Sequence, residues 1–183
     1  MPISPKLRTV STIMAWLSLV GAGCIIVGVP WAFLNPGYFF AQEGIKLGAV
    51  YATAGGLQIT AATPLIYRIA GMCVVAVPAG LRVWALIELF RLLRLYAVGH
   101  VFETAALSIL NRIASLLFWI VLAQALAESA ITSILGLVVG QHWFGFSFSF
   151  AELCFLFMAG IVLVIARVMA EAHRIADENT KFV

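Results

Sequence analysis

Charged residues are scarce in this chain of 183 residues: Asp, Glu, Lys and Arg together make up 10% of it, against about 25% in a soluble globular domain. Hydrophobic residues fill 63% of the sequence instead, and the mean hydropathy is +1.08. A folded chain of this length keeps a large share of its surface exposed, so that much apolar surface cannot be hidden from water. The composition excludes a soluble enzyme and a disordered protein, and it indicates an integral membrane protein.

Cysteine and histidine are also rare, with three residues of each. The cysteines lie in separate apolar runs and lack C-x-x-C spacing: Cys24, Cys73 and Cys154. This pattern predicts buried thiols that pack as small hydrophobic groups, not a disulfide framework. His142 is expected on the outer side of the membrane, and His100 and His173 on the inner side, so they cannot form one cluster. We therefore predict no metal site and no cofactor.

Catalytic signatures are absent as well. The sequence contains no H-E-x-x-H motif, P-loop or dinucleotide fingerprint, and its serines have no convergent base. We therefore predict that the protein is not an enzyme. Its formal net charge is +3, but the basic residues stand at segment ends and form no stripe, which indicates membrane topology and no direct binding of nucleic acid.

Four apolar stretches are long enough to cross a bilayer, whose hydrocarbon core of about 30 Å needs about 20 helical residues. They predict four helices and two outer loops: helices at about residues 10–34, 69–98, 103–137 and 151–178, loops at 35–68 and 138–150. The first stretch continues well past the roughly 7–15 apolar residues of a cleavable signal, which favours an uncleaved anchor over a processed N-terminus. The predicted fold class is an all-α membrane protein, a four-transmembrane-helix bundle in one domain of residues 1–183.

The distribution of Lys and Arg predicts the orientation. Eight of them flank the spans on one side, two lie on the other side, and one lies within a span. Because basic residues are retained on the cytoplasmic side, both termini are expected in the cytoplasm of a bacterial inner membrane.

The outer loops show strand-like alternation. Residues 55–60 alternate in polarity, and aromatic and small residues alternate with period two over residues 143–150. We predict that the two loops pair into a small extracytoplasmic β-element. Its aromatic face fits either a belt at the membrane interface or a lid over a ligand.

Arg82 is a full charge near the middle of the second span. Counting 1.5 Å per residue from the cytoplasmic ends of antiparallel helices places Gln124 and Glu128 of the third span at roughly 3–9 Å beyond its depth, within reach of a long side chain. These three residues are predicted to form an intramembrane polar cluster. The cluster fits a clamp that specifies helix packing, or a ligand, ion or proton site, and separate snorkelling of each group remains an alternative. One turn before Arg82, Pro78 removes a backbone donor and predicts a helix kink.

Two parts of the sequence resemble a known family. Residues 86–90 and 96–102 resemble the pattern L-x-x-L-F…Y-x-x-G-x-x-F, and residues 168–172 and 177–183 resemble V-x-x-E…E-N-x-x-x-V. The chain is similar in these motifs and in its layout to a bacterial family of four-helix inner-membrane proteins known only as a domain of unknown function. Members are often encoded beside a small helix-turn-helix regulator, so the resemblance implies such a regulator as a partner. It implies no catalytic or binding residues.

The remaining charges concentrate on the cytoplasmic side. We predict a cytoplasmic platform made of the 91–112 connection and the tail: Arg91, Arg94, His100, Glu103, Glu171, Arg174, Asp177 and Glu178. Arg91 and Arg94 are expected to project beyond the apolar core, where they either pair with acidic residues of the tail or anchor the helix at anionic headgroups. The predicted function is that of a non-enzymatic membrane signalling or regulatory subunit. Alternatives are a small transporter or ligand-binding bundle centred on Arg82, for which four helices would need a homo-oligomer, and an accessory subunit of a larger membrane complex.

Overall fold

The computed structural model describes residues 5–35, 53–54, 57–58, 63–98, 104–139 and 150–180. Most of them belong to four helices: α1 (Pro5–Leu34), α3 (Leu65–Val98), α4 (Thr104–Val139) and α5 (Phe150–Thr180). Both α1 and α3 begin a few residues before the apolar runs that predicted them. A helix satisfies its own backbone hydrogen bonds, so it continues past the apolar boundary into the polar layer of the membrane.

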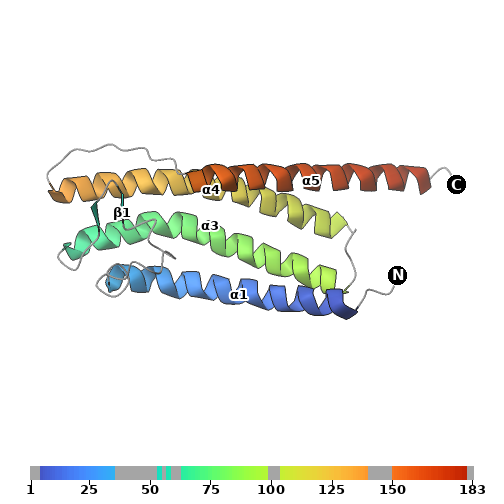
Figure 1. Ribbon diagram of the computed structural model, residues 1–183, viewed down its shortest axis with the longest axis horizontal. Coiled ribbons are helices and arrows are strands. Elements are labelled where there is room, and N and C mark those ends of the chain that lie inside the picture. Colours follow the sequence, from blue (N-terminus) through green and yellow to red (C-terminus); the bar gives the residue numbers. More distant parts are fainter. Residues whose placement is uncertain are drawn as a thin grey trace.

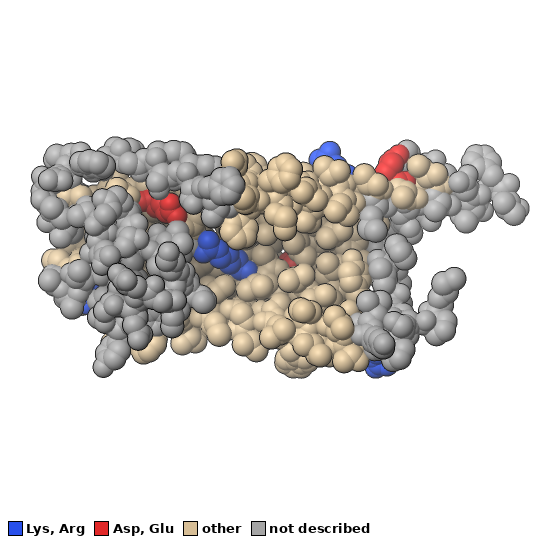
Figure 2. Space-filling view, viewed as in Figure 1, with Lys and Arg blue, Asp and Glu red and all other residues tan. Residues whose placement is uncertain are grey.

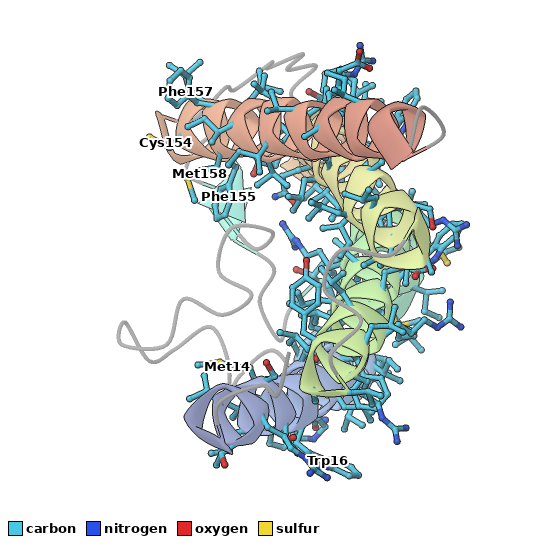
Figure 3. The ribbon with its side chains drawn as sticks, turned by 90° about the vertical axis from the view of Figure 1, so that its right-hand side faces the viewer. Met14, Trp16, Cys154, Phe155, Phe157 and Met158 are labelled. Atoms are coloured by element: carbon cyan, nitrogen blue, oxygen red, sulfur yellow. The ribbon has the colours of Figure 1, made fainter. Side chains whose placement is uncertain are left out.

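The helices stand in an open row (Figure 1). Helix α1 packs on α3, α3 on α4, and α4 on α5, and no other pair of described helices packs extensively. Seen from the end, the row curves into a C with α1 and α5 at its two edges (Figure 3). The predicted bundle is therefore corrected to an all-α row in which each helix contacts its neighbours in the sequence. Lipid tails can cover an apolar helix face as well as another helix can, so the apolar faces do not force the row to close.

Three helices are long and apolar enough to cross a membrane: Arg8–Leu34, Leu65–Val98 and Ala105–Ile134. These lengths exceed the roughly 20 residues that a bilayer core requires. In the described part of α5, the apolar segment is shorter and covers Leu153–Val168. The chain is thus a helical multi-pass membrane protein with three candidate spans.

The helices meet through small side chains and expose large ones. Ala15, Ala125 and Ala166 are almost fully buried, whereas Val27 and Phe157 are each about 70% exposed. Small residues let helix backbones approach closely in a membrane, and the large apolar groups face lipid. On the coloured part of the surface in Figure 2, charged side chains stand at only a few places. All three cysteines are exposed, which corrects the prediction of buried thiols, because a single row leaves at least two faces of each helix uncovered.

A short β-element lies beside α4. Strands β1 (Thr53–Ala54) and β2 (Leu57–Gln58) pair antiparallel, with Thr53 opposite Gln58, and both strands contact α4. This pairing lies entirely within the first predicted outer loop. The predicted pairing of that loop with residues 138–150 is not present among the described residues, since residues 140–149 lie outside them.

Candidate functional site

The seam between α3 and α4 holds two polar clusters between two apolar ones. At one end, Val75 of α3 packs against Ile131 of α4 and Phe33 of α1. At the other end, Leu92 of α3 packs against Ala106 and Ile113 of α4. The antiparallel register of the two helices brings polar residues together in the stretch between these apolar contacts.

The first polar cluster contains the three residues that the sequence predicts. Arg82 Nη2 donates a hydrogen bond of 2.8 Å to Gln124 Oε1, and Gln124 Nε2 donates one of 2.9 Å to Glu128 Oε1. Gln124 and Glu128 are buried, and Arg82 is half-buried. The predicted contact between Arg82 and Gln124 is present, and Gln124 links it to Glu128. A half-buried cation is therefore linked through Gln124 to a buried carboxyl group within the spans, where the low dielectric strengthens such bonds.

The second polar cluster surrounds Glu88, which is 1% exposed. Its Oε1 accepts three hydrogen bonds: 3.3 Å from Trp84 Nε1, 3.0 Å from Arg91 Nη1 and 3.0 Å from Arg112 Nη1. Arg91 lies on the same helix, whereas Arg112 comes from α4, so this carboxylate ties the two helices together. Glu88 Oε2 is buried and has no hydrogen-bond partner among the residues described, so one oxygen of a carboxylate that faces two guanidinium groups makes no hydrogen bond there.

Glu88 is not singled out by the sequence analysis, and it occupies an unspecified position of the L-x-x-L-F pattern at residues 86–90. A signal was available. Trp84 and Arg91 stand four residues before and three residues after Glu88, the spacings at which side chains share a helix face. Arg91 bonds Glu88 of its own helix, a contact that is not predicted from the sequence, and Arg94 Cζ lies 5.7 Å from the centroid of the Phe90 ring. The expected contacts of these two arginines with the tail or with headgroups stay predictions.

Other predicted site residues are placed only in part. Pro78 is buried inside α3, and the helix runs through it from Leu65 to Val98, so the kink stays a prediction. Glu171 is exposed on α5. His100 and Glu103 lie outside the described residues. Three further platform residues belong to α5, but their side chains are not among those described: Arg174, Asp177 and Glu178. The platform therefore also stays a prediction.

The rest of the described chain offers apolar surface at the two edges of the row. Phe155, Phe157 and Met158 stand on α5, and Met14 and Trp16 stand on α1 (Figure 3). A groove along α5 is lined almost wholly by apolar side chains, without the convergent polar groups that orient a small-molecule ligand. No group of three His, Cys, Asp or Glu residues that could hold a metal ion occurs in the described ranges.

Comparisons with known proteins give no relative from which to assign these clusters. No family model, no curated protein and no solved structure matches the chain. The resemblance to the four-helix family of unknown function therefore stays an expectation. What can be assigned is the geometry itself: a helical multi-pass membrane protein whose α3–α4 seam carries two polar clusters.

Proposed function

We propose that this chain is a non-enzymatic regulatory subunit of the bacterial inner membrane that acts through a platform on the cytoplasmic side. The observation that carries the proposal is the position of α5. This helix extends past the ends of α1, α3 and α4, at the end of the molecule where α3 ends and α4 begins (Figure 1). Because α5 packs on α4 but not extensively on α1 or α3 among the described residues, its polar last turns stand clear of the row and are open to a soluble partner.

The same arrangement supports the proposed orientation. Helix α1 begins and α5 ends at the end of the row that carries the α3–α4 connection (Figure 1). The excess of Lys and Arg also falls at this end of the spans, which supports a cytoplasmic position for both termini. With α5 as the fourth span, the chain has two connections outside and one inside.

Reporter fusions test this topology. Alkaline phosphatase folds only outside the cytoplasm, so a fusion after Gly140 is expected to be active and a fusion after Gly99 inactive. A cytoplasmic reporter such as green fluorescent protein serves as the control and should give the opposite pattern. An active phosphatase fusion after Gly99 together with an inactive one after Gly140 would reject the orientation.

Deletion of the C-terminal residues of the platform tests the proposed function. Deleting residues 175–183 is expected to leave expression and insertion intact, because α5 packs on α4 and its buried residues Ala159 and Ala166 lie before the deletion. The deletion should abolish capture of a soluble partner, for which a small helix-turn-helix regulator is our candidate. Affinity purification from native membranes with mass spectrometry measures the capture.

A matched control keeps the length of the tail. Replacing residues 175–183 by a Gly/Ser segment of equal length should fail in the same way as the deletion if side chains carry the interaction. A truncated chain that retains every partner of the full chain contradicts the platform.

The first polar cluster favours a second candidate, a ligand-binding or transport function. Arg82, Gln124 and Glu128 form a hydrogen-bonded chain within the spans, and charged groups at this depth often serve ions or protons. An open row encloses no pathway by itself, so transport would need a second copy of the chain or another membrane subunit. In that case an Arg82→Leu variant loses function while the tail deletion does not.

A further inference from the structure

We propose that Arg91 and Arg112 form a binding site for the phosphate group of an anionic phospholipid, with Glu88 holding the two guanidinium groups together. This inference does not depend on the regulatory function. It rests on the convergence of three side chains at one end of the α3–α4 seam and on their unequal exposure.

The geometry pairs the two arginines. Arg91 Nη1 and Arg112 Nη1 each lie 3.0 Å from the same oxygen, Glu88 Oε1, so the two nitrogens are no more than about 6 Å apart. A single phosphate group can bridge such a separation. The two side chains are 58% and 55% exposed, so their remaining N–H donors are open to a ligand. Guanidinium groups bind phosphate oxygens through two parallel hydrogen bonds, which a pair of them can do from two sides.

The charges are unbalanced in favour of an anion. Two guanidinium groups face one carboxylate, which leaves the cluster with one positive charge in excess. Glu88 is 1% exposed, so it positions the arginines but does not meet the ligand. A phosphodiester with one negative charge neutralises the cluster, whereas a zwitterionic headgroup brings a cation of its own and neutralises it less.

The depth of the site fits a lipid. Arg91 precedes the end of α3 at Val98, and Arg112 follows the start of α4 at Thr104, each by roughly 10 Å along its helix. Since α3 is roughly 50 Å long and a bilayer core about 30 Å, both arginines fall near the headgroup layer. Trp84, about two turns deeper than Arg91 and 50% exposed, donates to the same Glu88 oxygen. Its ring therefore lies beside the path of the glycerol and upper acyl chain, where tryptophan is common.

Native mass spectrometry of the purified full chain in a neutral detergent tests the site. The chain is titrated separately with short-chain phosphatidylglycerol, phosphatidylcholine and inorganic phosphate. We expect one phosphatidylglycerol per chain, bound about fivefold or more tightly than phosphatidylcholine, as one additional charge pairing at a membrane surface provides. Inorganic phosphate, which lacks the contacts with Trp84, should bind more weakly than phosphatidylglycerol.

Three variants distinguish binding at this site from non-specific attraction of the anionic lipid to other basic residues. Arg91→Gln keeps the Glu88–Arg112 link between helices, so it should fold, and it should weaken phosphatidylglycerol binding about fivefold. Arg112→Lys keeps the charge beside Glu88 but loses the planar fork, so it should also lower the preference for phosphatidylglycerol. Arg167→Gln removes an exposed arginine on α5 and serves as the matched control with unchanged binding.

Three results would overturn the proposal. The first is equal binding of phosphatidylglycerol and phosphatidylcholine by the unmodified chain. The second is a preference for phosphatidylglycerol that survives both Arg91→Gln and Arg112→Lys. The third is binding of inorganic phosphate in place of phosphatidylglycerol with the same dependence on the arginines, which would assign the site to a soluble phosphate and not to a lipid.

Discussion

Replacing Arg112 by leucine is expected to destabilise the chain far more than replacing Glu88 by leucine. The Arg112→Leu variant leaves the carboxylate of Glu88 buried at 1% exposure with Arg91 as its remaining cation. Breaking a fully buried pair costs about 3–5 kcal/mol. Because Arg112 is 55% exposed and Arg91 remains, screening reduces the expected loss to about 2 kcal/mol.

Replacing the acidic partner of this ion pair has a different consequence. Glu88→Leu removes the buried charge together with its unpartnered Oε2, and it leaves two arginines that can turn toward water or headgroups. The expected change in the free energy of unfolding is below about 1 kcal/mol. Unfolding by sodium dodecyl sulfate in mild detergent measures both variants, with Arg167→Leu as the control for loss of an exposed arginine. A Glu88→Leu variant that loses as much stability as Arg112→Leu would show that the carboxylate itself stabilises the seam.

Arg82→Leu is expected to uncouple the first polar cluster. The substitution takes away the donor that lies 2.8 Å from Gln124 Oε1, in a stretch where water cannot easily replace it. Hydrogen bonds between membrane helices average about 0.6 kcal/mol and reach about 1.7 kcal/mol in double-mutant cycles. Since the donor here is charged, we expect a coupling energy of about 1 kcal/mol between Arg82→Leu and Gln124→Leu.

A second cycle provides the comparison. Glu128→Gln combined with Arg82→Leu should show weaker coupling, because Gln124 stands between the two residues. It accepts from Arg82 through Oε1 and donates to Glu128 Oε1 through Nε2. Both cycles are measured as changes in the free energy of unfolding in the same detergent. Strict additivity of Arg82→Leu and Gln124→Leu would mean that their hydrogen bond does not stabilise the packing of α3 on α4.

The sequence predicts the Arg82–Gln124 contact because the contact depends mainly on the depth of each residue along its helix. Two antiparallel helices joined by a short connection have a fixed register, and the rise per residue then gives the depth of each side chain. Glu88 lies within the same helix and the same register. Its role depends instead on the conformations of three long side chains and on which of them reaches the surface, and residue spacing alone does not determine these.

The arrangement of the helices is less predictable than their number. Apolar length predicts four spans, since the bilayer core sets how many residues are needed, and three of them correspond to the candidate spans Arg8–Leu34, Leu65–Val98 and Ala105–Ile134. Whether Trp16 or Phe157 faces lipid or another helix is not encoded in hydropathy, because both surroundings are equally apolar. For this reason a closed bundle and an open row are equally compatible with the same pattern.

The open row also has a consequence for how the chain is made. Each extensive helix contact in the described structure joins neighbours in sequence, α1 with α3, α3 with α4 and α4 with α5. During synthesis, α1 can dock on α3 as soon as α3 enters the bilayer, and the Glu88–Arg112 bridge can close when the first turns of α4 follow. Each described helix can therefore pack on a partner that is inserted directly before or after it. Such local contacts shorten the time in which an unpaired Arg82 or Glu88 is exposed to the hydrocarbon before its partner on α4 arrives.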